Sequence, residues 1–437
     1  MKKGILSFAS LAFLGVLMNA QEIKFEEYDL PNGLHVILHQ DNSSPLVTTS
    51  VYYSVGSKDE SKGRTGFAHF FEHLLFEGTK NIKRGDWSKI VSSNGGGNNA
   101  TTDNDRTYYY EDFPSNNEQL GLWMEAERMR HAVISQIGVD TQREVVKEEK
   151  RLRFDNRPYG NLFTAITQTM FPNSQYGWTP IGSMDDLNSA KLEEFQDFYK
   201  KFYIPNNAVL VVAGDIKPAQ TKKWINDYFS TIPKGAAIIR NFTEDTPITQ
   251  EKSVTFTDPN IQLPMYLYSY RTPGNTTRDS KVMDLVSSYL SGGKSSVLYK
   301  KLVDQDKKAL QVSAESLAFE KAGFFACLAI PMGKTPEGEL RSVIDSEIKK
   351  LQTDLISDED LQKLQNKFEN QFVNQNSNIH SRAESLATYY ALTGNTNLIN
   401  KEIDIYRGIT KEDIRNAARK YLNPNQRIII NYVPEKK

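Results

Sequence analysis

The spacing of apolar residues predicts strands in two separate stretches of the chain. In the first stretch, residues 34–39, 47–55 and 208–212 are short runs rich in β-branched and aromatic residues. Residues 264–270 and 428–433 have the same character in the second stretch. Segments with helical periodicity separate these runs. The pattern therefore predicts an α+β fold, with helices and strands in both stretches.

The two stretches resemble each other at their ends. Residues 198–212 and 418–433 each read as a helix ending in an aromatic residue, a Pro/Asn turn and a strand. Two copies of one α+β unit explain this most economically, although any α+β domain can end in this way. After the first copy the helical periodicity stops, and short polar and proline-containing segments suggest a linker. We expect domains at residues 22–235 and 251–437.

Residues 1–20 have the pattern of a secretory signal peptide. Lys2 and Lys3 form a basic start, residues 5–18 are apolar, and cleavage is expected after Ala20. A membrane anchor is the alternative, but this apolar run is shorter than the roughly 20 residues that a spanning helix needs. We expect export to a periplasm or the extracellular space, and no membrane span after signal cleavage.

Composition narrows the classes of partner. The chain of 437 residues carries 53 Lys and Arg against 54 Asp and Glu. Since binding of nucleic-acid phosphates needs a basic excess, nucleic acid is not an expected partner. The single cysteine, Cys327, allows no internal disulfide, and its apolar neighbours predict a buried strand residue.

The most informative segment is residues 66–78, a largely apolar stretch that predicts a buried helix ending at Gly78. Positions i, i+3 and i+4 of a helix share a face, so His69, Glu72 and His73 point into one space. Neutral imidazoles suit Zn²⁺, and a catalytic site takes three protein ligands and leaves one position open. Zinc lowers the pKa of water there, and Glu72 can accept the proton.

Less specific interpretations compete with this one. Two core histidines beside an exposed acid would give the same letters, but burial of polar groups on an apolar helix needs a reason. A structural zinc site normally has four closed ligands, often cysteines, and the chain offers no suitable cysteine. His35 and His39 also lie four apart, but in a predicted strand of period two. We interpret them as sheet-face residues rather than ligands.

The His-x-x-Glu-His order of residues 69–73 resembles the pitrilysin/insulinase-type zinc peptidases, which reverse the common zincin motif. The resemblance implies a third ligand, a glutamate some seventy-odd residues further on. Residues 140–152 lie at that distance and look like the family's ligand helix.

Helical phase helps to choose the ligand within that segment. Glu149 shares a predicted apolar face with its neighbours Val145, Val146 and Leu152. Glu148 instead lies towards the charged side of the helix. We therefore expect Glu149 to be the third ligand.

The resemblance also implies a fold and an activity. The fold would be two similar domains, each a mostly antiparallel sheet with helices packed on it, enclosing a cavity. One zinc ion per chain, in the first domain, would serve an endopeptidase that hydrolyses peptides or unfolded segments with Glu72 as the base. Short relatives also act as non-catalytic or partner-dependent subunits of an assembly, which is the alternative function; loss of the motif would mark that role.

Residues 95–102 and 107–110 resemble the family's glycine-rich turn and edge strand. By this resemblance Asn99, Ala100 and Thr101 would bind the backbone of the peptide substrate. An open strand edge offers unpaired N–H and C=O groups to an extended chain, which gives sequence-tolerant binding. Without the nearby zinc motif, an ordinary hairpin edge would be the better interpretation.

Two positions depart from the family pattern. Many relatives have a second acidic residue two turns before the ligand glutamate, where this chain has Gln142, which can hydrogen-bond a neighbour but contributes no charge. Relatives that work alone also carry an Arg and a Tyr after the second-half glycine loop, and residues 302–312 contain neither. We expect a dimer with a non-identical partner of similar fold; a homodimer or a monomer is the alternative.

Overall fold

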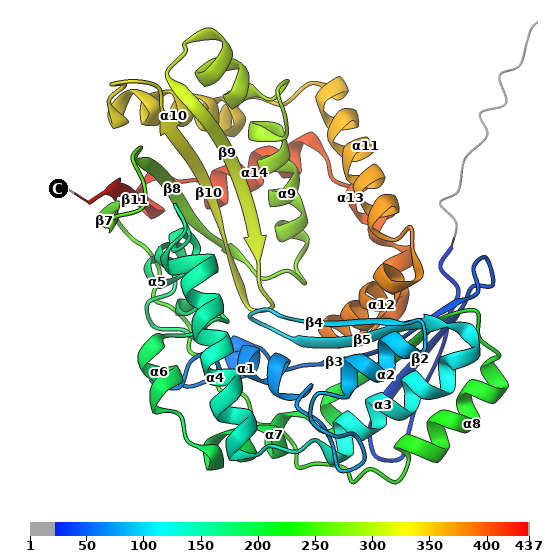
Figure 1. The fold of residues 1–437 in the computed structure, drawn as a ribbon. Coiled ribbons are helices and arrows are strands. Elements are labelled where there is room, and N and C mark those ends of the chain that lie inside the picture. The colour runs from blue at the N-terminus through cyan, green and yellow to red at the C-terminus, as the bar shows by residue number, and fades with distance from the viewer. Residues whose placement is uncertain (1–21, 436–437) are drawn as a thin grey trace, which may run out of the picture.

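The computed structural model describes residues 22–435, which form two β-sheets with helices packed on each (Figure 1). The predicted signal peptide, residues 1–20, lies outside the described residues. Within residues 22–435, no helix is both long enough and apolar enough to cross a bilayer.

The first sheet has six strands. In spatial order they are β1 (Glu26–Asp29), β2 (His35–Gln40), β6 (Ala208–Gly214), β3 (Leu46–Tyr53), β5 (Thr107–Pro114) and β4 (Gly97–Thr102). Strands β2 and β6 pair in parallel, and the other neighbours are antiparallel. Strand β4 therefore lies at an edge of the sheet.

The second sheet has five strands. In spatial order they are β7 (Lys252–Asp258), β11 (Arg427–Pro434), β8 (Met265–Pro273), β10 (Ala322–Pro331) and β9 (Ala309–Ala318). Only β7 and β11 pair in parallel. Apart from β1, the two sheets have the same strand order, with β3 in the place of β8 and β4 in the place of β9. The predicted pair of similar, mostly antiparallel α+β domains is confirmed.

Helices cover one face of each sheet with large apolar side chains. The first sheet carries α1 (Phe67–Leu74), α3 (Glu118–His131), α7 (Leu192–Phe202) and α8 (Pro218–Phe229). The second carries α9 (Arg278–Ser291), α10 (Glu337–Thr353) and α14 (Lys411–Tyr421). The other helices are α2 (Trp87–Ser93), α4 (Gln136–Lys150), α6 (Met184–Ser189), α11 (Asp358–Gln375) and α13 (Glu402–Arg407). Cys327 is fully buried in β10, as predicted.

The opposite face of each sheet is covered by a helix from the other half of the chain. Helix α5 (Leu162–Met170) packs on the second sheet, and α12 (Ile379–Thr393) packs on the first (Figure 1). Because both its faces are covered, all 7 residues of β6 are buried. The domain boundaries at residues 22–235 and 251–437 stay a proposal, because α5 and α12 each pack on the sheet of the other half.

A cavity of about 850 Å³ lies between the halves, bounded by the β4–β5 turn, the start of α9, α12 and α13.

His35 and His39 point to the α12 face of the first sheet: His35 stacks on Tyr390 at 3.3 Å, and His39 lies 3.1 Å from Arg382. They are sheet-face residues, as interpreted from the sequence.

Helix α1 is shorter than the sequence predicts, because it ends at Leu74 rather than at Gly78. The chain tightens after Leu74: Phe76 N–H donates to His73 O at 3.1 Å, and Glu77 N–H donates to Leu74 O at 3.0 Å. Gly78 then reverses the chain at φ +116°, where an added Cβ would lie 2.7 Å from Ile82 O. The glycine is thus part of the turn that follows the helix.

Candidate metal centre and active site

Three side chains that the sequence singled out as ligands lie together where α4 packs against α1. Glu149 Oε2 is 3.7 Å from His69 Nε2 and 3.3 Å from His73 Nε2. One possible ligand atom from each residue lies within 4.8 Å of the others. Within residues 22–435 this is the only group of three or more His, Cys, Asp or Glu side chains arranged in this way.

The donor set fits a zinc ion. Burial, together with the neighbouring His73, lowers the pKa of His69 to about 4, so its imidazole is neutral at pH 7, the form that coordinates metals. His73 Nε2 is buried and makes no hydrogen bond of acceptable geometry with any described group. A buried ring nitrogen without a partner is costly, and coordination would satisfy it.

Glu72 lies on the same helix, one residue before His73, and is not a member of the cluster. Its side chain is partly buried, and this burial raises its pKa above the usual range of a carboxyl group. A carboxylate with a raised pKa is a stronger base, which suits proton abstraction near neutral pH.

The predicted apolar face of Glu149 is right for Val146 and wrong for Val145 and Leu152. Val145 and Leu152 are 43% and 64% exposed, whereas Val146 is fully buried. The inward stripe of α4 is Val139, Gln142, Val146 and Glu149, and it is narrow because α4 packs mainly on α1. Val145 and Leu152 belong to the exposed stripe of Glu148, whose carboxylate pairs with Arg151 at 3.1 Å.

The sequence did not predict two contacts at the cluster. Arg153 Nη1 lies 3.0 Å from Glu149 Oε1, so the oxygen that faces away from the histidines has a cationic partner. The i,i+4 spacing of these residues was the available signal. Tyr109 of β5 donates to Phe71 O in α1 at 2.7 Å, and only the fold brings these two residues together.

Gln142 is directed at a neighbour of the cluster rather than at a ligand. Its Nε2 donates to Glu77 Oε1 at 2.6 Å, and the other oxygen of Glu77 pairs with Arg84. The glutamine therefore links α4 to the turn that follows α1.

Strand β4 presents an open edge beside α1. Among the described residues it pairs only with β5, with Asn99 opposite Tyr110 and Thr101 opposite Tyr108. Asn99 and Thr101 are exposed, whereas Ala100 is buried against the core. Arg106 donates to Thr101 Oγ1 at 2.7 Å and thereby ties the strand to the turn that follows it.

Two family models match the chain in succession. The model described as "Insulinase (Peptidase family M16)" matches residues 35–182, and "Peptidase M16 inactive domain" matches residues 189–368. The chain belongs to the insulinase family of peptidases, M16. The first match contains His69, His73 and Glu149, and the second covers much of the other half of the chain.

Relatives within the M16 family include named zinc proteases. The chain is 28% identical over 365 residues to "Zinc protease PqqE" of Helicobacter pylori, and the alignment covers 82% of each chain. A solved structure of a protease from the same organism is 26% identical, has a TM-score of 0.86, and is matched over 95% of this chain and 100% of its own.

A longer solved structure shows the same fold at lower identity. The periplasmic protease PqqL of Escherichia coli is 19% identical with a TM-score of 0.76, and the match covers 95% of this chain but 48% of PqqL. At that identity the likeness concerns the fold alone.

Proposed function

We propose that this chain is a zinc-dependent endopeptidase that hydrolyses peptides or unfolded segments. The observation that carries the proposal is the convergence of His69, His73 and Glu149 within 4.8 Å, beside a partly buried acid, Glu72, on the same helix. Two imidazoles and one carboxylate form a ligand set of catalytic zinc sites, which leaves a position open. The zinc-protease relatives support the same assignment.

The chain's own residues would divide the work as follows. His69, His73 and Glu149 would hold one Zn²⁺, and Arg153 would hold the outward oxygen of Glu149. When bound, Zn²⁺ would polarise the scissile carbonyl and acidify the attacking water. Glu72 would accept the proton of that water and pass it to the departing amine.

The open edge of β4 would bind the substrate. An extended peptide could add as a further strand to β4, with its backbone aligned by Asn99, Ala100 and Thr101. Such binding needs a chain that can become extended. This favours unfolded segments over folded domains.

We also propose that the chain is exported and works with a partner. Export rests on the pattern of residues 1–20, and the similar protease PqqL is periplasmic. Partnership rests on residues 302–312, which lack the Arg and Tyr of relatives that work alone. Since PqqL is about twice as long as the part matched here, a second chain of similar fold would supply an equivalent of its remaining half.

One experiment tests the activity. The purified protein is assayed for metal content and incubated with a mixed peptide library, with and without a chelator. Zinc is then added back to the chelated sample. We expect about one zinc per chain and cleavage that is lost and restored with the metal. A protein that binds zinc but cleaves nothing, alone or with co-purified proteins, would favour the non-catalytic subunit.

The partnership has a separate test. The protein is isolated from its native source under mild conditions, co-eluting chains are identified, and turnover is compared with and without them. We expect weak activity from the chain alone. Full activity from a monodisperse monomer would refute the partnership and leave the hydrolytic function intact.

A further inference from the structure

The N-terminal end of α1 is capped by a residue from outside the helix. Gly66 occupies the N-cap position at φ +92° and has no side chain that could accept a hydrogen bond. The carboxyl group of the buried Glu60 takes this place: its Oε2 accepts from Gly66 N–H at 2.9 Å and its Oε1 from Ala68 N–H at 2.8 Å. Because Ala68 directly precedes His69, the position of Glu60 fixes the start of the helix that carries the ligands.

Glu60 follows a short 3₁₀ helix, η1 (Ser57–Asp59), that is bound to the turn between β4 and β5. Ser57 N–H donates to Asp103 O at 3.2 Å, and Lys58 N–H donates to Asn104 O at 2.9 Å. A Cβ on Gly56 would lie 2.5 Å from Asn104 C. The backbones at Gly56 and Asn104 are therefore closer together than a residue with a side chain would allow. The cap of α1 and the end of β4 are thus held by one set of backbone contacts.

The second half of the chain reaches this junction through the turn between β9 and β10. Glu320 in that turn places Oε2 3.0 Å from Lys58 Nζ, which also lies 3.2 Å from Asp105 Oδ1. Glu320 N–H donates to Asp105 Oδ2 at 2.8 Å, and Lys321 N–H donates to the Tyr176 hydroxyl at 3.1 Å. The Lys58 side chain is 6% exposed.

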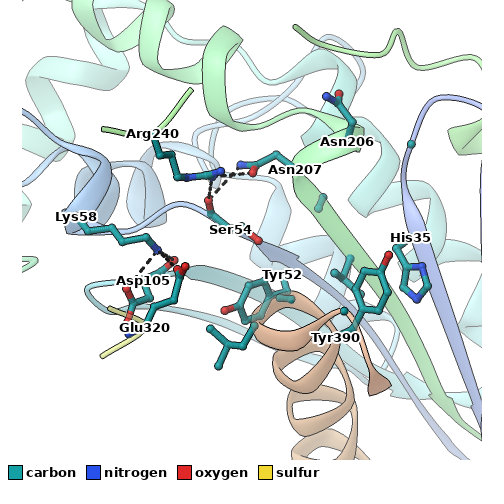
Figure 2. A pocket seen from close by; sticks show the side chains of 16 residues that line it. His35, Tyr52, Ser54, Lys58, Asp105, Asn206, Asn207, Arg240, Glu320 and Tyr390 are labelled. Atoms are coloured by element: carbon teal, nitrogen blue, oxygen red, sulfur yellow. Dashed lines mark hydrogen bonds and ion pairs between the residues drawn. The ribbon is translucent and has the colours of Figure 1, made fainter. Parts of the chain in front are cut away.

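Figure 2 shows the Lys58 ammonium group between Asp105 and Glu320, on the wall of a cavity of about 380 Å³. Arg240 of the segment that joins the halves lies beside it and pairs with Asp59 of η1 at 2.8 Å. Both halves and the connecting segment therefore contact η1. We call Lys58, Asp105 and Glu320 the junction triad.

We propose that the junction triad positions the active site, so that the half without metal ligands sets the geometry of the half that has them. Glu320 holds η1 through its contacts with Lys58 and Asp105. From there, Glu60 connects η1 to α1, and the β4–β5 turn connects η1 to β4. Lys58, Asp105, Glu320 and Glu60 are positioning residues, since none of them belongs to the metal cluster or to β4. The inference rests on the proposed peptidase function.

Glu320→Gln is the principal test, because it removes one charge and keeps the size of the side chain. The matched control is Arg382→Gln, which breaks the 2.6 Å pair of Arg382 with Asp41. That pair also joins the second half to the first sheet, but neither residue contacts η1 or the β4–β5 turn.

We expect Glu320→Gln to lower kcat about tenfold with little change in KM, because displacement of reacting groups by about an ångström can cost up to about a hundredfold. Hydrogen exchange of the amides of residues 66–68 and 97–102 should become faster, at unchanged zinc content. Arg382→Gln should change neither kcat nor these amides. Lys58→Met should resemble Glu320→Gln, and the double variant should be no worse than either single one.

Two outcomes would overturn the inference. One is wild-type kcat and wild-type amide protection in Glu320→Gln. The other is equal losses in Arg382→Gln, which would reduce the junction triad to ordinary packing between the halves. If the wild-type protein cleaves no peptide, the proposed function fails, and the hydrogen-exchange comparison of the two variants still decides the positioning role.

Discussion

Helices α1 and α9 occupy the same place in the two halves, each following the strand at the third position of the shared strand order and packing against the corresponding edge strand. Helix α9 is long and capped by its own sequence, since Thr277 Oγ1 accepts from Ser280 N–H at 3.2 Å. Helix α1 has 8 residues, starts at a glycine and takes its cap from Glu60. The two halves thus share one architecture, but α9 is capped by the residue that directly precedes it, whereas α1 is capped by a side chain from outside the helix.

The two helices also differ in how their polar side chains are satisfied. No buried side-chain nitrogen or oxygen of α9 lacks a hydrogen-bond partner, and its Asp284 accepts from the Tyr406 hydroxyl at 2.7 Å. In α1, His69 Nδ1 and His73 Nε2 both lack one. Of these two helices, only α1 keeps buried side-chain nitrogens without a partner, and both belong to residues of the candidate metal cluster.

The largest effect should come from a change that removes the proposed general base, Glu72 of α1, and leaves the metal ligands intact. Glu72→Gln should retain about one zinc per chain and lose hydrolysis by about 10²- to 10⁴-fold, the usual contribution of general acid–base catalysis. His69→Ala should instead lose the metal. Metal analysis and turnover on one peptide measure both effects, and near-normal turnover in Glu72→Gln would remove the proposed role of this residue.

The choice of third ligand can be tested within α4 by two adjacent acids. Glu149→Ala should weaken zinc binding by more than the about 10- to 100-fold typical of residues that only support a ligand. Glu148→Ala should bind zinc as the wild type does, because its side chain lies on the exposed stripe. Competition with a chelator of known affinity measures both, and reversed effects would show that the wrong acid was chosen.

Changes at the two helix starts should separate stability from metal binding. Gly66→Ala forces a side chain into the left-handed region at φ +92° and should cost about 1–2 kcal/mol and weaken zinc binding. Thr277→Ala removes the cap of α9 and should cost about 1 kcal/mol with zinc binding unchanged. Urea unfolding and zinc titration distinguish the two, and a weaker metal site in Thr277→Ala would contradict the expected independence of α9.

The smallest effect is expected from Asp284→Asn in α9. Burial raises the pKa of Asp284 above its usual value, so the stability it contributes is full below about pH 4 and is lost as pH rises through the raised pKa. The asparagine variant should lack this part of the pH dependence, with hydrolysis unchanged. Unfolding of both proteins between pH 4 and pH 8 gives the difference, and parallel curves would exclude a titrating Asp284.

Local spacing was sufficient to find the centre of the site. The His69–His73 spacing fixes a shared helix face before any fold is known, and the fold class follows from the two sets of strands. Glu60 could not be found in this way, because no periodicity of the sequence places its carboxyl group beside the amides of Gly66 and Ala68. The apolar pattern of α4 was misleading because exposed Val145 and Leu152 mimic a buried face.

Long-range packing was also beyond sequence patterns. Residues 162–170 and 379–393 form helices, but even a clear helical periodicity would not say which sheet a helix covers. The equivalence of the halves was visible at their ends, where a helix, a turn and a strand recur. The exchange of α5 and α12 between the sheets required the structure.

That exchange has a consequence for biosynthesis. When residues 22–235 have left the ribosome, the face of β6 that contains Val209 and Val211 is complete but uncovered, since α12 is still about 150 residues away in the chain. The nascent first half therefore exposes a continuous apolar surface until almost the whole protein has been made. A chain built in this way is exposed to aggregation during its synthesis, because apolar surface that is transiently uncovered tends to associate.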